Sequence, residues 1–345
     1  MALSTVFLAS SLCVPQTQNR PLSVPKSHSV LSPTTSSLIL PPQATKKFHF
    51  QNQPLKSNRS VGTVKALQSD ENGRIYKNVE VFSWEHLHES LAHDVVELSR
   101  QAIDDKGTFT VALADTSSIR FLSNLVKSEY SNRIDWSKWQ FFWVEEEVFL
   151  PSYTLRKTRF FPNEILHRVA YAEFLSMVQK AGTLNVVTID YDISAKEEAA
   201  ERYSRNLREW TERGYLRSAA SGHPKFDLML LGMEADGRVG SLIPNNPVLD
   251  ERDRWVTHVV HETETPRLTL TLPVINSSSY IAMVVTGEDN ANAVYSALNE
   301  EIDPRAPRKI PAKFISPLDG QLMWYLDRAA ASRLFKQELH IDQRY

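Results

Sequence analysis

The segment from residue 226 to 247, FDLMLLGMEADGRVGSLIPNNP, gathers residue types that could do chemistry. Two carboxylates, Glu234 and Asp236, and one guanidinium, Arg238, follow an apolar run in a turn that contains Gly237. A carboxylate can act as a general base, whereas a guanidinium stays protonated at physiological pH and cannot. Arg238 could instead bind phosphate or stabilise an oxyanion, with Glu234 or Asp236 as the base. For Asp236 we favour the alternative of a turn residue that hydrogen-bonds its own loop, as Asp before Gly commonly does.

A second group of charges lies earlier in the chain, where Glu145, Glu146 and Glu147 form an acidic run. Basic residues follow this run: Arg156, Lys157, Arg159 and Arg168. Three neighbouring carboxylates repel an anion, so the basic residues could form a relocated phosphate site. The alternative is that they pair with the carboxylates. We favour pairing because surface charge clusters usually neutralise each other.

The sequence gives little indication of a metal site or of a cysteine nucleophile. The histidines near strand-like runs are His223, His258 and His261. A lone histidine beside a strand is more often structural or exposed than catalytic. No HExxH spacing occurs, and Cys13 is the only cysteine. We therefore expect no metal site and no thiolate nucleophile.

These groups must be positioned by elements that alternate along the chain. Strand-like runs are expected at 108–114, 139–144, 184–189, 226–231, 255–260, 268–272 and 281–286. Helical patterns are expected at 117–126, 164–180, 195–213, 289–299 and 321–334. Such alternation favours a mostly parallel sheet covered on both faces. Open sheets of this class bind ligands beyond the carboxyl ends of their strands, which is where the turn after residue 231 lies.

Several motifs together resemble the 6-phosphogluconolactonase family. The turn is similar to that family's GMGPDGHxxSLFP, and it keeps Gly232, Met233, Asp236, Gly237, Ser241, Leu242 and Pro244. Residues 270–276, LTLPVIN, are similar to ITLTxPxIN, and residues 285–287 to a VTG strand end. A PAxxV…WxxDxxAA pattern is matched by Pro311, Ala312, Trp324, Asp327 and Ala330. The likeness spans about residues 78 to 335. The related glucosamine-6-phosphate deaminases continue differently after the DGH element.

The resemblance implies both a fold and a reaction. The fold would be α/β, with a modified doubly wound, mostly parallel sheet like that of glucosamine-6-phosphate deaminase and ribose-5-phosphate isomerase, and a smaller β-containing lobe. The reaction would be hydrolysis of 6-phospho-D-glucono-1,5-lactone to 6-phosphogluconate in the oxidative pentose phosphate pathway, without metal or organic cofactor. It requires a deprotonated water, a stabilised oxyanion and a held phosphate dianion.

Each of these tasks has a family signature that is altered in this chain. The glycine-rich SGGSTP loop becomes residues 114–119, ADTSSI, where Asp115 stands in place of a glycine and Ser117 and Ser118 remain as phosphate ligands. Glu147 replaces the arginine of DERxVP, and residues 153–155 lie roughly where the family has an SN pair. Arg238 replaces the histidine that accepts the proton, and Asn290 replaces a lysine. Five changes in one pocket point to a relaxed or redirected function.

The first part of the chain has the composition of a targeting segment. Residues 1–69 contain no Asp or Glu but 7 Lys and Arg and 12 Ser, which is typical of an organellar transit peptide. The Met1-Ala2 start and the sequence Val64-Lys65-Ala66 favour a plastid. We expect a disordered chloroplast transit peptide at 1–66, a linker at 67–77 and the folded domain at 78–340. The alternative is a disordered basic tail on a cytosolic protein.

Charge and hydropathy limit the partners of the remaining chain. It carries 32 Lys and Arg against 41 Asp and Glu, a net charge of about −9. An acidic protein is a poor ligand for nucleic acid or anionic membranes. No apolar stretch approaches the length that spans a bilayer. We expect no nucleic acid partner and no membrane insertion.

Two hypotheses of different class remain open for a protein of the chloroplast stroma. One is an enzyme that still hydrolyses the sugar-phosphate lactone, or a related small ester, through rearranged groups. The other, which the altered pocket favours, is a non-catalytic homologue that binds a sugar phosphate or a plastid protein partner.

Overall fold

The computed structural model describes residues 78–127, 129–148, 166–181, 185–187, 189, 196–260, 266–299 and 309–335. The expected transit peptide, the expected linker, His261 and the basic residues Arg156, Lys157 and Arg159 lie outside this part of the chain. No helix in the described part is long and apolar enough to cross a membrane.

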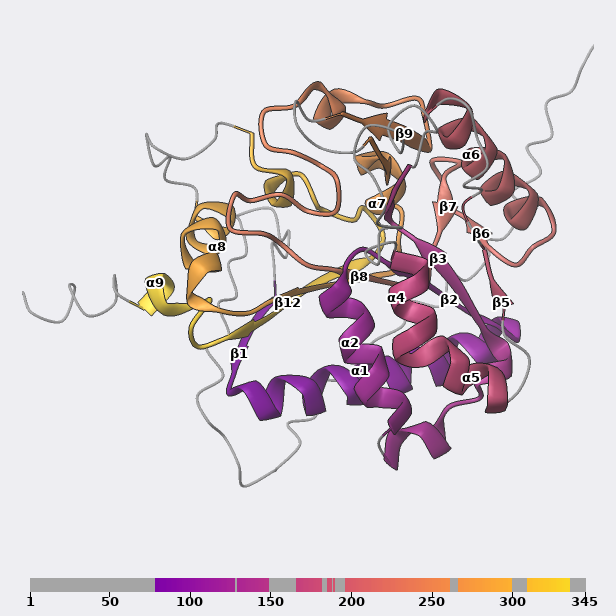
Figure 1. The fold of residues 1–345 in the computed structure, drawn as a ribbon, viewed down its shortest axis with the longest axis horizontal. Helices are drawn as coiled ribbons and strands as arrows, with labels where there is room; N and C mark the ends of the chain where they lie inside the picture. The colour runs from indigo at the N-terminus through magenta and orange to yellow at the C-terminus, as the bar shows by residue number, and fades with distance from the viewer. Residues whose placement is uncertain are drawn as a thin grey trace, which may run out of the picture. The chain divides into compact units, whose positions relative to one another are not determined.

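A seven-stranded sheet forms the centre of the fold (Figure 1). Across the sheet the order is β1 (Asn78–Phe82), β12 (Gln321–Asp327), β11 (Tyr280–Val285), β8 (Leu228–Leu231), β2 (Phe109–Leu113), β3 (Trp139–Trp143) and β5 (Asn185–Val186). Every neighbouring pair is parallel. All residues of β2, β3 and β8 are buried, as expected for parallel strands covered on both faces. The prediction of a mostly parallel α/β sheet is confirmed.

Helices cover the sheet on both faces. They are α1 (Trp84–Lys106), α2 (Thr116–Lys127), α4 (Leu166–Ala170), α5 (Ser176–Ala181), α6 (Lys196–Glu212), α7 (Leu272–Ile275), α8 (Ala291–Leu298) and α9 (Ser332–Phe335). Alternate residues of β3 identify the two faces. The Phe141 ring contacts Phe174, which lies between α4 and α5, with 5.5 Å between ring centroids. The Phe142 ring contacts Trp210 of α6 at 5.6 Å. In Figure 1, α1, α2, α4 and α5 lie together, away from α6.

A smaller antiparallel sheet stands beside the central one. It consists of β4 (Glu145–Glu147), β10 (Arg267–Leu270) and β9 (Val256–Val259), with β10 in the middle. α6 packs against β9. A two-stranded ribbon joins β6 (Arg217–Ser218) to β7 (Pro224–Lys225). The smaller β-containing lobe is thus present, and β4 links it directly to the end of β3.

The sequence patterns were wrong or incomplete in several places. Residues 321–334 were expected to be helical, but 321–327 form strand β12 and only 332–335 are α-helical. Leu322, Trp324 and Leu326 are buried, and the strand lies between β1 and β11, so sheet pairing outweighs the helical spacing. The helix expected at 164–180 contains a π-helical turn at Tyr171–Leu175. Neither β1 nor α1 was anticipated.

Candidate functional site

The loops that follow four neighbouring strands meet at one edge of the central sheet. Because β2, β3, β8 and β11 are parallel to their neighbours, their carboxyl ends lie on the same side. The loops that begin at residues 114, 144, 232 and 286 therefore border one region. This is the place where open α/β sheets bind ligands.

In the first of these loops, the side chain of Asp115 occupies the N-terminus of α2. Its Oδ1 accepts a hydrogen bond from the backbone N–H of Ser118 at 2.7 Å. The carboxylate also packs against Gly232 so closely that a Cβ at that position would lie 2.0 Å from Oδ2. Burial raises the pKa of Asp115, and the N–H groups of Ser118, Gly232 and Ser117 partly offset this rise. The helix end that could receive an anion already holds a carboxylate.

Ser117 and Ser118, the remaining phosphate ligands in the sequence interpretation, differ in their surroundings. Ser117 is exposed. Ser118 is buried, and its hydroxyl donates to the carbonyl of Leu230 in β8 at 3.4 Å. The hydroxyl of Ser118 is therefore engaged with the sheet.

In the second loop, the acidic run forms strand β4 and its side chains alternate between two faces. Glu147 lies directly opposite Arg267 of β10, and Glu145 lies opposite Thr269. Arg267 therefore shares a face with Glu145 and Glu147, while Glu146 points to the other face. The period of two along a strand separates three carboxylates that are adjacent in the sequence.

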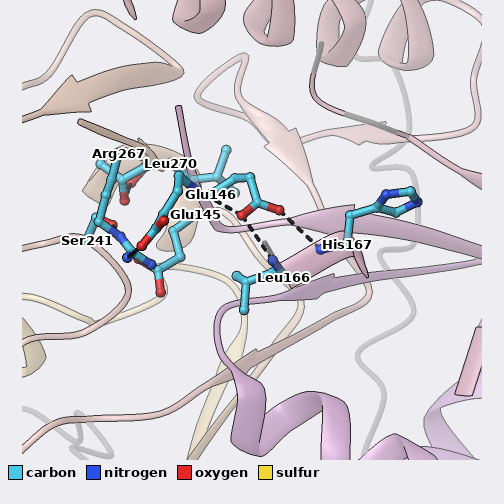
Figure 2. A network of polar contacts seen from close by, with 9 residues as sticks. Glu145, Glu146, Leu166, His167, Ser241, Arg267 and Leu270 are labelled. Carbon is cyan, nitrogen blue, oxygen red and sulfur yellow. Dashed lines mark hydrogen bonds and ion pairs between the residues drawn. The ribbon is translucent and has the colours of Figure 1, made fainter. Parts of the chain in front are cut away.

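Arg267 binds the two carboxylates on its face and Ser241 as well (Figure 2). Its Nη1 lies 2.8 Å from Glu147 Oε1 and its Nη2 lies 3.2 Å from Glu145 Oε2. Its Nε donates to the hydroxyl of Ser241 at 2.9 Å, and that hydroxyl donates to the Glu145 carboxylate. Burial raises the pKa of Glu145; Arg267 and Ser241 oppose the rise, whereas the charge of Asp115 adds to it.

Glu146 is fully buried and caps helix α4 (Figure 2). Its Oε1 accepts from the N–H of Leu166 at 3.0 Å, and its Oε2 accepts from the N–H of His167 at 3.1 Å. The N–H of Glu147 also donates to Oε1 at 3.0 Å. Helix N-termini favour negative charge, so this carboxylate has a structural role.

The expected pairing of the acidic run with the basic residues that follow it stays a prediction, because most of those residues lie outside the described part of the chain. Arg267, which was not anticipated, supplies a cation for Glu145 and Glu147. Of the four expected basic partners, Arg168 alone is described, within α4. The signal that was missed is the register between β4 and β10, which brings together residues 120 positions apart.

The third loop, the turn after β8, is closed by its own hydrogen bonds. The N–H of Gly237 donates to the carbonyl of Glu234 at 2.8 Å, and Gly237 adopts a φ of +87°, a conformation that favours glycine. Asp236 Oδ1 accepts from the N–H of Arg238 at 2.9 Å, which agrees with its interpretation as a turn residue. Asp236 Oδ2 lies 3.3 Å from Arg238 Nη2. Glu234 is exposed.

In the fourth loop, Asn290 follows β11 in a 3-10 turn, Glu288–Asn290. Its side-chain amide donates to the carbonyl of Thr286 at 2.8 Å, and the residue is partly buried. The structure thus brings this position to the same edge as Asp115 and Gly237. Asn290 supplies no positive charge there.

The described histidines named in the sequence analysis make local contacts. His223 Nδ1 lies 3.0 Å from the hydroxyl of Ser221, and His258 Nε2 lies 3.5 Å from a carboxylate oxygen of Glu197. Burial lowers the pKa of both imidazoles. These contacts agree with structural roles.

His167 is a further candidate that sequence reasoning missed. It is the second residue of α4, and its ring packs edge-on against Trp143, the last residue of β3, with 5.7 Å between ring centroids. Burial lowers the pKa of His167, and the charge of Arg168 adds to this effect. A lowered pKa favours the neutral imidazole, which is the form that a general base requires.

Metal ligands are not clustered in the described residues. No group of three or more His, Cys, Asp and Glu side chains there could hold a metal ion. The polar groups at this edge can bind, orient and exchange protons.

Comparisons with known proteins identify a matching family and related chains. A family model described as "Glucosamine-6-phosphate isomerases/6-phosphogluconolactonase" matches residues 83–324. The chain is 35% identical to 6-phosphogluconolactonase 3, chloroplastic, of Arabidopsis thaliana over 350 residues, 97% of this chain and 100% of that protein. It is 37% identical to probable 6-phosphogluconolactonase 2 of Oryza sativa subsp. indica over 258 residues, 73% of this chain and 88% of that one.

Solved structures agree on the fold. 6-Phosphogluconolactonase from Trypanosoma brucei matches with a TM-score of 0.59 and 20% identity over 74% of this chain and 98% of its own. A monomeric glucosamine-6-phosphate deaminase matches with a TM-score of 0.55 and 18% identity over 74% of this chain and 98% of its own.

Proposed function

The chain belongs to the glucosamine-6-phosphate isomerase/6-phosphogluconolactonase family, and we propose that it is a plastid member whose lactonase activity is weak or lost. One observation carries the proposal. The altered groups beyond the carboxyl ends of the central strands are engaged with the protein's own chain: Asp115 caps α2, Arg267 holds Glu145 and Glu147, and Arg238 pairs with Asp236.

This arrangement disfavours binding of the phosphate group of a lactone substrate. A phosphate dianion would meet the Asp115 carboxylate at the end of α2. The guanidinium of Arg267, 2.8 Å from Glu147, is held by two carboxylates. Like charges in a partly dry site repel more strongly than in water. Weak substrate binding follows.

The proton acceptor is affected independently. Arg238 stands at the position of the family's histidine, and a guanidinium cannot take a proton from water. Loss of general-base catalysis alone typically lowers a rate by about 10²–10⁴. Two separate defects, in binding and in proton transfer, support a protein that keeps the family fold without its full chemistry.

Location in the plastid stroma is part of the same proposal. Residues 1–69 have the acid-free, Ser-rich composition of a transit peptide. The Arabidopsis relative that matches 97% of this chain is named as chloroplastic. Both observations support import of the protein, with removal of residues 1–66.

A second candidate function is an enzyme that uses a different base. His167 supports it, because its imidazole contacts Trp143 at the end of β3 and burial lowers the pKa of that imidazole. In that case the protein would hydrolyse the lactone or a related sugar-phosphate ester. In the first case it would bind a sugar phosphate or a plastid protein without turnover.

Lactone hydrolysis by purified residues 67–345 tests the proposal. We expect a rate close to that of the spontaneous reaction, with the Arabidopsis relative as the positive control. Arg238→His alone should add little, because an unheld substrate seldom reaches the base in a reactive pose. Adding Glu147→Arg, Asp115→Gly and Thr116→Gly should raise the rate by more than the product of the separate effects.

Two outcomes would change the assignment. Rapid hydrolysis by the wild-type protein would overturn the proposal, and its loss in His167→Asn would establish the second candidate. A combined variant that folds but neither binds nor hydrolyses the lactone would show that these positions do not form the family's site.

A further inference from the structure

We infer that the open edge of strand β1, together with the exposed indole of Trp84, is a docking site for an extended basic segment of a partner protein, which adds a strand to the central sheet. Three features of the molecule support this: a backbone edge, an aromatic side chain at the end of that edge, and an acidic helix face beside it. The docking site does not depend on whether the protein hydrolyses a lactone.

β1 forms one edge of the seven-stranded sheet. Among the described residues it pairs with β12 alone, and in Figure 1 it runs along the rim of the sheet and leads directly into α1. Alternate residues of an edge strand direct their N–H and C=O groups away from the neighbouring strand. The sequence of β1, NVEVF, contains neither the Pro nor the Lys that commonly protects such edges. The strand at the opposite edge, β5, has only two residues and offers little backbone to pair.

The side chains of β1 hold this edge in place. Val79 and Val81 are 8% and 5% exposed and belong to the hydrophobic core. Phe82, the last residue of the strand, stacks on Tyr325 of β12 with 6.2 Å between ring centroids. A partner therefore meets a preformed edge, and the free-energy cost of ordering that edge does not reduce the affinity.

An exposed aromatic side chain lies at the end of this edge. Trp84 follows Phe82 by two residues, begins α1 and is 54% exposed. Its ring contacts His88 edge-on with 4.6 Å between ring centroids, and His88 stacks on Phe121 of α2 at 6.1 Å. The indole is thus supported from one side and open on the other. Trp is among the residues that most often dominate binding energy at protein interfaces.

The helix face beside Trp84 is acidic. Glu85 and Glu89 lie four residues apart in α1, and both are exposed. The first Lys or Arg of α1 is Arg100, in the second half of the helix. A second copy of this chain would bring the same carboxylates to the edge, where like charges repel. A segment that carries Lys or Arg is attracted instead, so the favoured occupant is a basic extended segment of another protein.

Binding of a synthetic strand tests the docking site. The probe is a fluorescently labelled octapeptide of alternating Lys and Val. It is titrated into the full chain and into residues 67–345 at constant ionic strength, and binding is read as fluorescence anisotropy. One control peptide has Glu in place of Lys. A second has Pro at its two central positions, which removes a hydrogen-bond donor from each edge of the peptide.

Two variants locate the contact. Trp84→Ala removes the aromatic side chain at the end of β1. The matched control is Tyr215→Ala, because Tyr215 is also exposed, at 43%, but lies between α6 and β6. Amide hydrogen exchange of residues 78–82 is measured with and without the probe.

We expect both forms of the protein to bind the Lys-Val peptide. Trp84→Ala should bind it at least about tenfold more weakly, whereas Tyr215→Ala should match wild type. The Glu-Val peptide and the Pro-containing peptide should each bind at least about tenfold more weakly than the probe. Hydrogen exchange of residues 78–82 should slow, because N–H groups on the open side of β1 become hydrogen-bonded.

Three outcomes would overturn the inference. Equal binding by wild type and Trp84→Ala, or unchanged hydrogen exchange in β1, would place the contact elsewhere. Binding by residues 67–345 but not by the full chain would identify residues 1–66 of this chain as the occupant. A wild-type dimer in sedimentation velocity that Trp84→Ala dissociates would identify a second copy as the occupant.

A further variant keeps the test decisive if Trp84→Ala does not fold. Glu89→Lys changes an exposed side chain and reverses its charge. It should weaken binding of the Lys-Val peptide and strengthen binding of the Glu-Val peptide, and unchanged binding of both would also overturn the inference. Lactone hydrolysis is measured separately, so a failure of the docking site and a failure of the proposed function are distinguishable.

Discussion

Asp115 illustrates how a residue can be unsuited to a reaction and well suited to the fold. Burial disfavours its charge, yet the N–H groups at the start of α2 stabilise it. Glu146 has the same role at α4. At the scale of single residues, carboxylates that would repel a substrate are satisfied by the backbone.

The pH dependence of stability should report the burial of Asp115. Its pKa lies above the ordinary value of 3.8 in the folded protein. The folded state therefore retains a proton that the unfolded state releases, and the free energy of unfolding falls as pH rises from 3.8 through the folded pKa. Asn has no such proton. The stability of Asp115→Asn relative to wild type should increase over this window and then level off.

Urea unfolding of both proteins at about pH 4 and about pH 7.5 measures this difference. Removal of the Asp115 charge also lowers the pKa of Glu145 toward its ordinary value. This second effect likewise increases the stability of Asp115→Asn relative to wild type as pH rises. A difference in stability that does not vary with pH would contradict the assigned burial.

At the scale of elements, the pairing of β4 with β10 determines which cation binds Glu145 and Glu147. Arg267→Ala should destabilise the protein by about 3 kcal/mol, because buried Glu145 would lose the guanidinium that faces it. The control is Arg254→Ala, which removes an exposed Arg side chain that lies 3.9 Å from Glu251 and should cost less than about 1 kcal/mol. Urea unfolding measures both.

A second substitution makes this test more specific. Glu145→Gln in the Arg267→Ala background should recover part of the loss, since a neutral amide needs no cation. If the two Arg variants lose equal stability, the Arg267 group contributes no more than a surface pair.

The sequence was most informative where an element satisfies its own local rules. The buried runs of β2, β3 and β8 and the turn around Gly237 could be predicted from apolar patterning and glycine placement. Strand β12 could not, because its identity depends on neighbours far away in the chain. Arg267 was missed for the same reason.

Some features of the candidate site could likewise be predicted from local sequence, and others could not. Local sequence indicated that Arg238 and Asp115 depart from the family pattern, and that Asp236 belongs to a turn. The partner of each charge required the tertiary structure, since Asp115 meets Gly232 and Glu145 meets Ser241 only across strands. His167 had no local signal, because its significance comes from its contact with Trp143.

At the scale of the whole molecule, residues 1–66 should be sufficient for targeting. Fused to a fluorescent reporter, they should direct it to plastids, because acid-free basic segments are imported. The matched control is the same fusion with several Ser residues changed to Asp or Glu, which should remain in the cytosol. A cytosolic reporter from the unchanged segment would contradict the targeting proposal.

The order of strands in the sheet also determines which strands can pair early during synthesis and which must pair late. β1 and β12, the first and last strands of the described residues, pair with each other, so that Asn78 meets Met323. A ribosome releases residue 78 long before residue 323, whereas β2 and β3 emerge close together and can pair early. Pairings between distant segments are slow because a long loop must close first. The strand nearest the proposed targeting segment is consequently among the last to join the sheet, and that end of the nascent chain stays unpaired until synthesis is almost complete.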